Sequence, residues 1–285
     1  MTLSLSRHSA DLFVPDDSPL PQALARTTHL AVGAHQDDLE LMAAHGVEEC
    51  FQNPARWFTG VVVTDGGGSA RAFEYEAYSD EQMREVRKLE QRKAAYVGEY
   101  SAMLQLGHPS SAVKDGAAPD VLADLCAILR ATTPEVVYTH NLADKHDTHV
   151  AVCLRLIAAC QALAPSERPR RIIGCEVWRD LDWLCDADKV VMPLDRRENL
   201  HAALMGVFDS QIAGGKRYDL ATAGRRRAHA TYFESHGTDQ HTQLTWGMDL
   251  TTLLDGVRPE ELVQRYIARF ESEVSQRLAK LSGAR

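Results

Sequence analysis

The sequence predicts an α/β fold in which a mainly parallel sheet carries helices on both faces. Short apolar runs rich in β-branched residues have the length and composition of buried strands. Longer segments with apolar side chains at helical spacing lie between them. This alternation is typical of parallel sheets covered by helices, and ligands bind such sheets at the carboxyl ends of the strands.

The composition is that of one globular domain. Of the 285 residues, 45% are hydrophobic and 25% are charged, so the chain can form a buried core and global disorder is excluded. Domains with α/β folds reach about 250 residues, so we expect 1–285 to form a single domain. The net charge of −9 makes nucleic acid and anionic membranes poor partners.

The cysteine pattern predicts a reducing, cytoplasmic location. None of the six cysteines forms a C-x-x-C pair, and a chain of this size does not need disulfides. The first residues contain no apolar segment long enough for a secretory signal. No apolar stretch of about 18 residues is present, so no membrane span is expected.

The expected elements follow an irregular N-terminal arm at 1–27. Strands are expected at 28–34, 60–64, 135–140 and 171–178, and 189–192 is a candidate for a fifth. Helices are expected at 39–51, 79–98, 120–131, 149–160, 200–207 and 259–281. The segment 211–285 is expected to be a C-terminal cap or extension, although 211–256 is weakly patterned.

Polar residues follow three of the expected strands directly. Because the carboxyl ends of parallel strands meet at one edge of a sheet, these residues are expected to converge. They are His35, Gln36, Asp37, Asp38 and Glu40 after the first strand, Asp65 after the second, and His140, Asn141, Asp144, His146, Asp147 and His149 after the third.

The first and third clusters contain histidine and carboxylate groups, which suit a divalent metal such as zinc. His35 and Asp38 are three residues apart at a strand-to-helix turn, so both can face one ion. A catalytic zinc site has three protein ligands and an open position for water, and His149 would complete that count. Asp37 would then lie beside the metal and take a proton from the bound water. His146 could stabilise an oxyanion or protonate a leaving nitrogen.

Simpler structural roles are open for the same residues. Asp37 and Asp38 could cap the helix that follows them, and Asp147 could cap the helix at 149–160. The glycines at 66–68 could form a tight turn or could let the backbone approach a substrate. They lack the lysine and the spacing of a phosphate-binding loop, so nucleotide binding is little favoured.

At these positions the sequence resembles the PIG-L/LmbE-type deacetylases. The family's first motif, A-H-P-D-D-x-E, corresponds to residues 34–40, and its later motif, D-x-H-x-D-H, corresponds to residues 144–149. A T-D-G segment after the second strand is matched at 64–66, and the resemblance spans about 28–211. It implies a Rossmann-like, LmbE-like sheet with a C-terminal helical extension.

The resemblance also implies a function. Family members are zinc-dependent enzymes that remove acetyl groups from N-acetylglucosaminyl compounds, with metal-bound water as the nucleophile. We therefore expect this chain to bind one zinc or other divalent ion and to hydrolyse an N-acetylated amino sugar. The implied roles are metal ligands at His35, Asp38 and His149, a general base at Asp37, oxyanion stabilisation at His146, and substrate binding at Arg71 and Asp65.

The second motif departs from the family pattern. Thr148 occupies the position of the family's aspartate, and Asp147 lies one residue earlier. A shift of one residue on a helix rotates a side chain by about 100°. Asp144 and Asp147 are therefore the two candidates for the supporting carboxylate.

Two other functions stay open. The chain could be a catalytically impaired homologue that binds a sugar or a metal, or it could hydrolyse another amide or an ester on the same scaffold. The expected partner is a small acetylated amino sugar, and a homo-oligomer is compatible with the resemblance. The sequence does not name the exact substrate.

Overall fold

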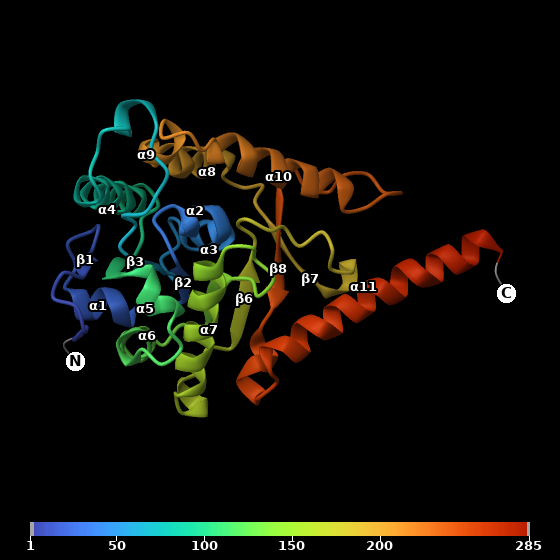
Figure 1. Cartoon of the computed structure of the whole chain (residues 1–285), viewed down its shortest axis with the longest axis horizontal. Helices are drawn as coiled ribbons and strands as arrows, with labels where there is room; N and C mark the ends of the chain where they lie inside the picture. Colours follow the sequence, from blue (N-terminus) through green and yellow to red (C-terminus); the bar gives the residue numbers. More distant parts are fainter. Residues whose placement is uncertain (1–2, 284–285) are drawn as a thin grey trace.

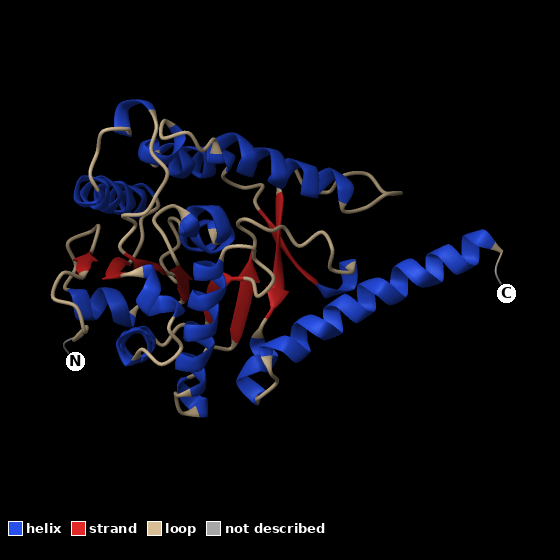
Figure 2. Ribbon diagram, viewed as in Figure 1, coloured by secondary structure: helices blue, strands red, loops and turns tan. Residues whose placement is uncertain are grey.

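The computed structural model describes residues 3–283, and it has one eight-stranded sheet between two layers of helices (Figures 1 and 2). This architecture confirms the predicted fold class. In the order of the chain, the strands are β1 (Asp11–Phe13), β2 (His29–Gly33), β3 (Phe58–Thr64), β4 (Ala102–His108), β5 (Val136–His140), β6 (Arg171–Cys175), β7 (Lys189–Pro193) and β8 (Leu244–Asp249). Their order across the sheet is β1-β4-β3-β2-β5-β6-β8-β7.

The centre of the sheet is parallel, and its strand order places a site between β2 and β5. Strands β4, β3, β2, β5 and β6 pair in parallel, while β1 and β8 pair antiparallel with this block. The chain proceeds outward from β2 through β3 to β4 on one side and from β5 to β6 on the other. Ligands bind where the strand order reverses in this way. The register aligns Val32 with Thr139, so the residues after these two strands emerge side by side.

Two apolar layers bury the two faces of the sheet. One face packs against α1, α6 and α7, and the other packs against α2, α3, α4 and α8. The helices are α1 (Leu20–Ala25), α2 (Asp38–Met42), α3 (Ala44–Cys50), α4 (Asp80–Val97), α5 (Ser110–Lys114), α6 (Pro119–Thr132), α7 (Asp147–Gln161), α8 (Glu198–Gly206), α9 (Asp209–Ile212), α10 (Tyr218–Tyr232) and α11 (Pro259–Ser282). Short 3₁₀ turns lie at Phe73–Tyr75, Pro165–Glu167, Asp186–Asp188 and Thr251–Asp255.

The structure corrects the expectation of an irregular N-terminal arm. Residues 11–13 form β1, which pairs antiparallel with β4 at the edge of the sheet, and residues 20–25 form α1. A three-residue strand has too few positions to show alternation, and the prolines at 19 and 21 obscured the short helix. Residues 1 and 2 lie outside the described part of the chain.

Two strands and one helix break were also missed. Strand β4 contains Gly107 and ends directly before Pro109, and both are typical turn residues, while β8 lies in the weakly patterned segment. The expected helix at 39–51 is instead α2 followed by α3, with the break at Ala43. The candidate strand at 189–192 is present as β7 and pairs antiparallel with β8.

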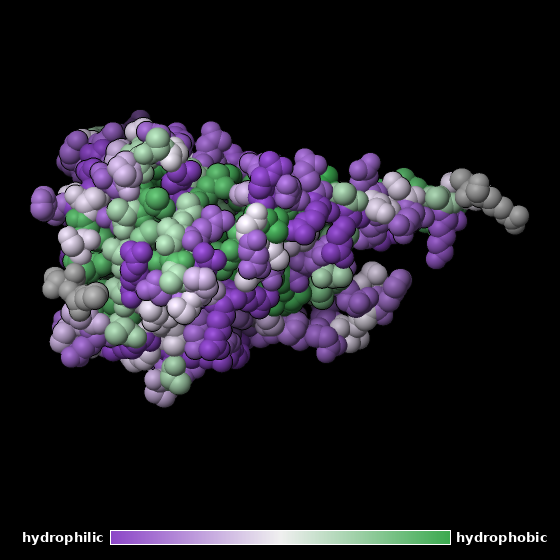
Figure 3. Space-filling model, turned by 90° about the horizontal axis from the view of Figure 1, so that it is seen from below, coloured by the Kyte–Doolittle hydropathy of each residue, from purple (hydrophilic) through white to green (hydrophobic). Residues whose placement is uncertain are grey.

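Helix α11 extends away from the rest of the molecule (Figure 1). Its first turns pack on the body through Leu262, which is buried, and Tyr266. Its distal turns stand clear, and there hydrophilic side chains lie beside apolar ones that are also exposed, namely Phe270, Val274, Leu278 and Leu281 (Figure 3). None of the helices within residues 3–283 combines the length and the apolarity that a membrane-spanning helix needs.

Candidate functional site

A cavity of about 690 Å³ opens at the carboxyl ends of the parallel strands. Its floor is formed by residues that follow β2, β3 and β5, and its outer wall is formed by residues after β6 and by α10. The residues that the sequence predicted to converge do so here, with the exceptions given below. They include His35, Asp37, Asp38, Asp65, His146 and His149.

Three of these residues bring a metal-ligating atom to one point. The Nδ1 atom of His35 lies 3.2 Å from Nε2 of His149 and 3.3 Å from Oδ2 of Asp38, and Nε2 of His149 lies 3.5 Å from Oδ1 of Asp38. Ligands placed tetrahedrally at about 2.1 Å from an ion lie about 3.4 Å from one another. The three donors therefore have the spacing of ligands around one divalent ion, and among residues 3–283 they form the one such group that geometry identifies.

The turn between β2 and α2 positions Asp38. As the first residue of α2, Asp38 accepts a hydrogen bond from the backbone N–H of His35 through Oδ2, at 2.7 Å. Burial alone would raise the pKa of this carboxyl, but the rings of His149 and His140 hold it well below its usual value. Asp38 is therefore an ionised, buried carboxylate, which is the form that ligates a metal.

Asp144 provides the carboxylate that supports His149. Its Oδ2 lies 3.7 Å from Nδ1 of His149, and Oδ1 accepts a hydrogen bond from the backbone N–H of His146 at 2.9 Å. Burial lowers the pKa of His149, but Asp38 and Asp144 together raise it above its usual value. Asp147 is exposed at the start of α7, and buried Thr148 lines the cavity. Of the two candidate carboxylates, Asp144 is the one at the site.

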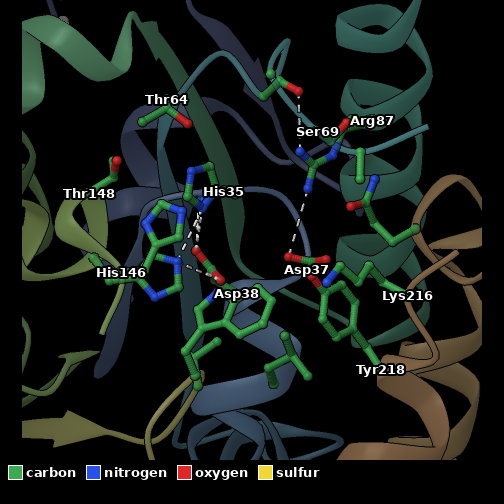
Figure 4. A pocket seen from close by; sticks show the side chains of 18 of the residues that line it. His35, Asp37, Asp38, Thr64, Ser69, Arg87, His146, Thr148, Lys216 and Tyr218 are labelled. Carbon is green, nitrogen blue, oxygen red and sulfur yellow. Dashed lines mark hydrogen bonds and ion pairs between the residues drawn. The ribbon is translucent and has the colours of Figure 1, made fainter. Parts of the chain in front are cut away.

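Asp37 lies beside the metal-ligating group but faces the other way, toward Arg87 (Figure 4). Its carboxylate is 3.8 Å from the Arg87 guanidinium, and it is only 4% exposed. Burial raises its pKa well above the usual range, and the charges of Asp38 and Glu40 raise it further, against the opposite effect of Arg87. A buried carboxyl whose pKa is raised in this way is a candidate for a general base.

Helix α4 holds the backbone of Asp37 in an unusual conformation. Asp37 has a φ of 91°, a region that side-chain-bearing residues seldom occupy. Its N–H donates to Oε1 of Gln91 at 3.2 Å, and Arg87 donates to the carbonyl of Gln36 at 2.7 Å. The side chain of Gln36 also donates to Gln105, at 3.1 Å, so this turn is fixed although it lacks the proline of the family motif.

His146 lies next to two of the metal-ligating residues. Its ring centre is 5.1 Å from that of His35 and 4.5 Å from that of His149, and the ring of Trp178 stacks beyond it at 6.5 Å. Burial and these two neighbouring histidines lower its pKa. Its Nδ1 has no hydrogen-bond partner within residues 3–283, so the ring is held by packing rather than by a carboxylate.

The two expected substrate-binding residues lie in different places. Asp65 lines the cavity and pairs with Arg84 at 3.0 Å. Arg71 does not line it, because its guanidinium donates to the carbonyls of Gly67, at 2.6 Å, and Tyr78, at 2.7 Å, and pairs with Asp80. In the structure Arg71 therefore holds the glycine loop in place, and its role in substrate binding stays a prediction.

The sequence placed His140 in the converging cluster but gave it no role. Its ring stacks on that of His149 at 3.8 Å, and Nε2 accepts a hydrogen bond from the N–H of Ala34 at 2.9 Å and lies 3.4 Å from Asp38. Burial lowers its pKa to about 4, so it is a neutral packing partner of the group. In the sequence, the only indication of this role is that His140 is the last residue of an expected strand.

The outer wall was missed. It comes from β6 onward and from the weakly patterned segment, and its members share no spacing that marks a site. They are Val177, Trp178, Gln211, Lys216, Tyr218, Ala221, Thr222 and Arg225.

Comparison with protein families agrees with the two motifs. Residues 30–160 match the family described as PIG-L: GlcNAc-PI de-N-acetylase. The match covers slightly less than half of the chain. The matched region contains the three metal-ligating residues together with Asp37 and His146, whereas the outer wall of the cavity lies beyond it. No curated protein matches the sequence.

Several solved structures share the fold of this chain. A conserved protein from Thermus thermophilus is 18% identical with a TM-score of 0.62, over 79% of this chain and 94% of that one. N,N'-diacetylchitobiose deacetylase from Pyrococcus horikoshii is 14% identical with a TM-score of 0.61, over 82% and 87% of the two chains. A 4-carboxy-2-hydroxymuconate hydratase from Pseudomonas putida is 18% identical with a TM-score of 0.58, over 79% and 96%. A deacetylase and a hydratase thus share this scaffold, so the fold alone does not determine the reaction.

Proposed function

We propose that the chain is a metal-dependent hydrolase that removes the acetyl group from an N-acetylated amino sugar of the N-acetylglucosamine type. The observation that carries the proposal is the three-donor group of His35, Asp38 and His149, with the buried carboxyl of Asp37 beside it, inside the region that matches the PIG-L family. The activities named for the family and for the chitobiose deacetylase support the choice of reaction and substrate class.

The donor set favours zinc. Two imidazole nitrogens and one carboxylate are a common zinc-binding set, and catalytic zinc sites keep a further position open. His35, Asp38 and His149 would hold the ion, and Asp144 would orient His149 through its second ring nitrogen. When bound, such an ion polarises a carbonyl oxygen and lowers the pKa of a water molecule.

The side chains around this group can then move the protons of amide hydrolysis. Asp37 accepts a proton from the attacking water as the new carbon–oxygen bond forms. The carbon–nitrogen bond then breaks, the amine leaves with the proton from Asp37, and acetate remains. His146, which lines the cavity beside His35, donates a hydrogen bond to the oxygen of the amide as negative charge develops there.

The cavity suits a sugar. Its volume of about 690 Å³ falls in the usual range for small-molecule sites. Trp178 and Tyr218 present aromatic rings in its outer wall, 6.0 Å apart and edge to face. Aromatic side chains offer an apolar face with a polar edge, which is what a pyranose ring needs.

The structure weakens the hypothesis of a catalytically impaired homologue. That hypothesis rested on the change at Thr148, but Asp144 occupies the place beside His149 and Asp37 is held by Arg87 and Gln91. These contacts support the proposal that Asp144 supplies the supporting carboxylate and Asp37 the base.

The proposal is tested by amine release from methyl N-acetylglucosaminide and N,N'-diacetylchitobiose. The protein is assayed zinc-loaded, after chelation, and after zinc is restored, with an acetate ester of the same sugar as the comparison. We expect release that disappears on chelation, returns with zinc, and favours the amide. No amine release from zinc-loaded protein, or faster ester than amide cleavage, would contradict the proposal.

A further inference from the structure

Three positively charged side chains line the cavity without a carboxylate partner. They are Lys114 at the end of α5, Lys216 before α10, and Arg225 on α10. Within residues 3–283, none of them forms an ion pair, whereas Arg71, Arg84 and Arg87 nearby all do. The chain as a whole carries a net charge of −9, so this local excess of free positive charge runs against its composition.

The acidic residues of the cavity are already engaged. Asp38 faces the histidines, Asp37 lies 3.8 Å from Arg87, and Asp65 lies 3.0 Å from Arg84. The charges still available to a ligand are therefore positive. A cleft lined by one sign of charge concentrates ligands of the opposite sign.

Lys216 and Arg225 share one wall with Trp178. The Nζ atom of Lys216 lies 5.1 Å from the centre of the Trp178 ring, and Arg225 donates to the carbonyl of the preceding Val177 at 2.6 Å. Figure 4 shows Lys216 and Tyr218 together on the side of the cavity where Asp37 lies. Arg225 uses one guanidinium nitrogen on Val177, which leaves the other donors free to bind an anion.

Helix α10 adds to the positive potential of this wall. Tyr218, Ala221, Thr222 and Arg225 recur at helical spacing and line the cavity, so one face of the first two turns is turned toward it. The helix runs for 15 residues from this point, and its N-terminal end carries the positive pole of the dipole.

The position of this wall fixes where an anion would sit on a substrate. The Trp178 ring lies 6.5 Å from the ring of His146, which in turn lies 4.5 Å from that of His149. The wall is therefore about one sugar ring away from the metal-ligating group. An acetamide at that group would place a substituent of the same sugar, or the group directly attached to it, against Lys216 and Arg225.

We infer that Lys216, Arg225 and Trp178 form a subsite for a phosphate or carboxylate carried on, or directly attached to, the acetylated amino sugar. The inference rests on the proposed function for the acetyl group, but the subsite itself needs only the cavity wall. Lys216 and Arg225 line the cavity, whereas Arg71 does not, and both lie outside the matched PIG-L region.

Binding to metal-free protein tests the subsite without turnover. Calorimetry would compare N-acetylglucosamine 1-phosphate and N-acetylmuramic acid, which carries a carboxylate, with neutral methyl N-acetylglucosaminide. We expect at least one anionic sugar to bind roughly tenfold or more tightly than the neutral one, with a preference that falls as salt rises. The two anionic sugars distinguish a phosphate from a carboxylate.

Variants that remove one positive charge identify the residues responsible for the preference for anionic sugars. Lys216→Gln and Arg225→Gln should each reduce it by roughly tenfold, and Arg225→Lys should retain part of it. Arg227→Gln is the matched control, because Arg227 lies exposed on the same helix and does not line the cavity. Thermal melting of each variant would show that it is folded.

Equal binding of charged and neutral sugars, or no binding of any, would overturn the subsite. A preference that is lost in Lys114→Gln but kept in Lys216→Gln and Arg225→Gln would also overturn it, because the anion would then lie on the opposite wall. Acetate release by zinc-loaded protein separates the two proposals. Release from the neutral sugar without an anion preference supports the deacetylase alone, and anion-selective binding without release from any sugar supports the subsite alone.

Discussion

The carboxylate of Asp144 lies 3.7 Å from Nδ1 of His149, while Nε2 of the same ring faces His35 and Asp38. The negative charge of this carboxylate favours a proton on Nδ1, which leaves Nε2 free to ligate a metal. The N–H of Trp178 also donates to Asp144, at 3.1 Å, so the same carboxylate joins the metal-ligating group to the outer wall of the cavity.

Asp144→Asn and Asp147→Asn form a matched pair that tests this relationship. We expect Asp144→Asn to weaken zinc binding by roughly 10- to 100-fold, because the partner of His149 loses its charge. Asp147 is exposed at the start of α7, so Asp147→Asn should leave zinc affinity within about twofold. A zinc titration with a competing chelator gives both numbers. Equal effects of the two changes would contradict the role of Asp144.

Asp37→Asn should separate proton transfer from metal binding. Asparagine tolerates a positive φ better than most residues, so this variant should keep the turn that α4 holds. We expect kcat to fall by roughly 10²- to 10⁴-fold while the zinc content stays unchanged. Elemental analysis and amine release would be measured on the same sample. A zinc-replete variant with near-normal kcat would exclude Asp37 as the base.

Arg71→Ala should act on stability rather than on substrate affinity. The change removes hydrogen bonds to the carbonyls of Gly67 and Tyr78 and a pair with Asp80, which together we expect to cost about 1–2 kcal/mol of the free energy of unfolding. The KM of good substrates should change by less than about twofold. Denaturant unfolding and steady-state kinetics provide the comparison. A several-fold rise in KM with unchanged stability would instead indicate that Arg71 binds substrate.

His29 should make the fold sensitive to mild acid. Burial, together with the charge of Arg56, lowers its pKa from 6.5 to about 4. The unfolded chain therefore binds this proton at a higher pH than the folded chain does. The stability is fully present above about pH 6.5 and is lost as the pH falls toward about 4, by as much as about 3 kcal/mol.

A His29→Gln variant isolates this contribution. Its free energy of unfolding, measured by denaturant titration at several pH values, should depend less on pH between about 4 and 6.5 than that of the unchanged protein. Parallel curves for the two proteins across that interval would show that His29 does not carry the effect.

The polar ends of three strands were enough to predict most of the candidate site. His35 and Asp38 follow β2 directly and His149 follows β5, so strand polarity alone brings them to one edge. The buried partners could not be predicted in this way. The contacts of Gln91 with Asp37 and of His140 with His149 depend on how α4 and β5 pack, and no spacing in the sequence encodes that packing.

The outer wall of the cavity could not be predicted from the sequence, for a different reason. Trp178, Lys216 and Arg225 come from a loop after β6 and from the region around α10, where the sequence has little periodicity. Strand β8 was missed in the same segment, although it lies between β6 and β7 in the sheet. Its alternation is weak because residues 244–248 are all buried, so no polar face marks the period of a strand.

A metal held by His35, Asp38 and His149 is central to the proposed hydrolysis. The most direct measurement is a zinc titration of metal-free protein in which bound zinc and acetate release from an N-acetylated amino sugar are recorded together, for the unchanged protein and for His149→Ala. We predict that acetate release rises in proportion to occupancy and saturates at one ion per chain, and that His149→Ala loses both. Full acetate release from metal-free protein, or unchanged zinc binding and activity in His149→Ala, would contradict the account.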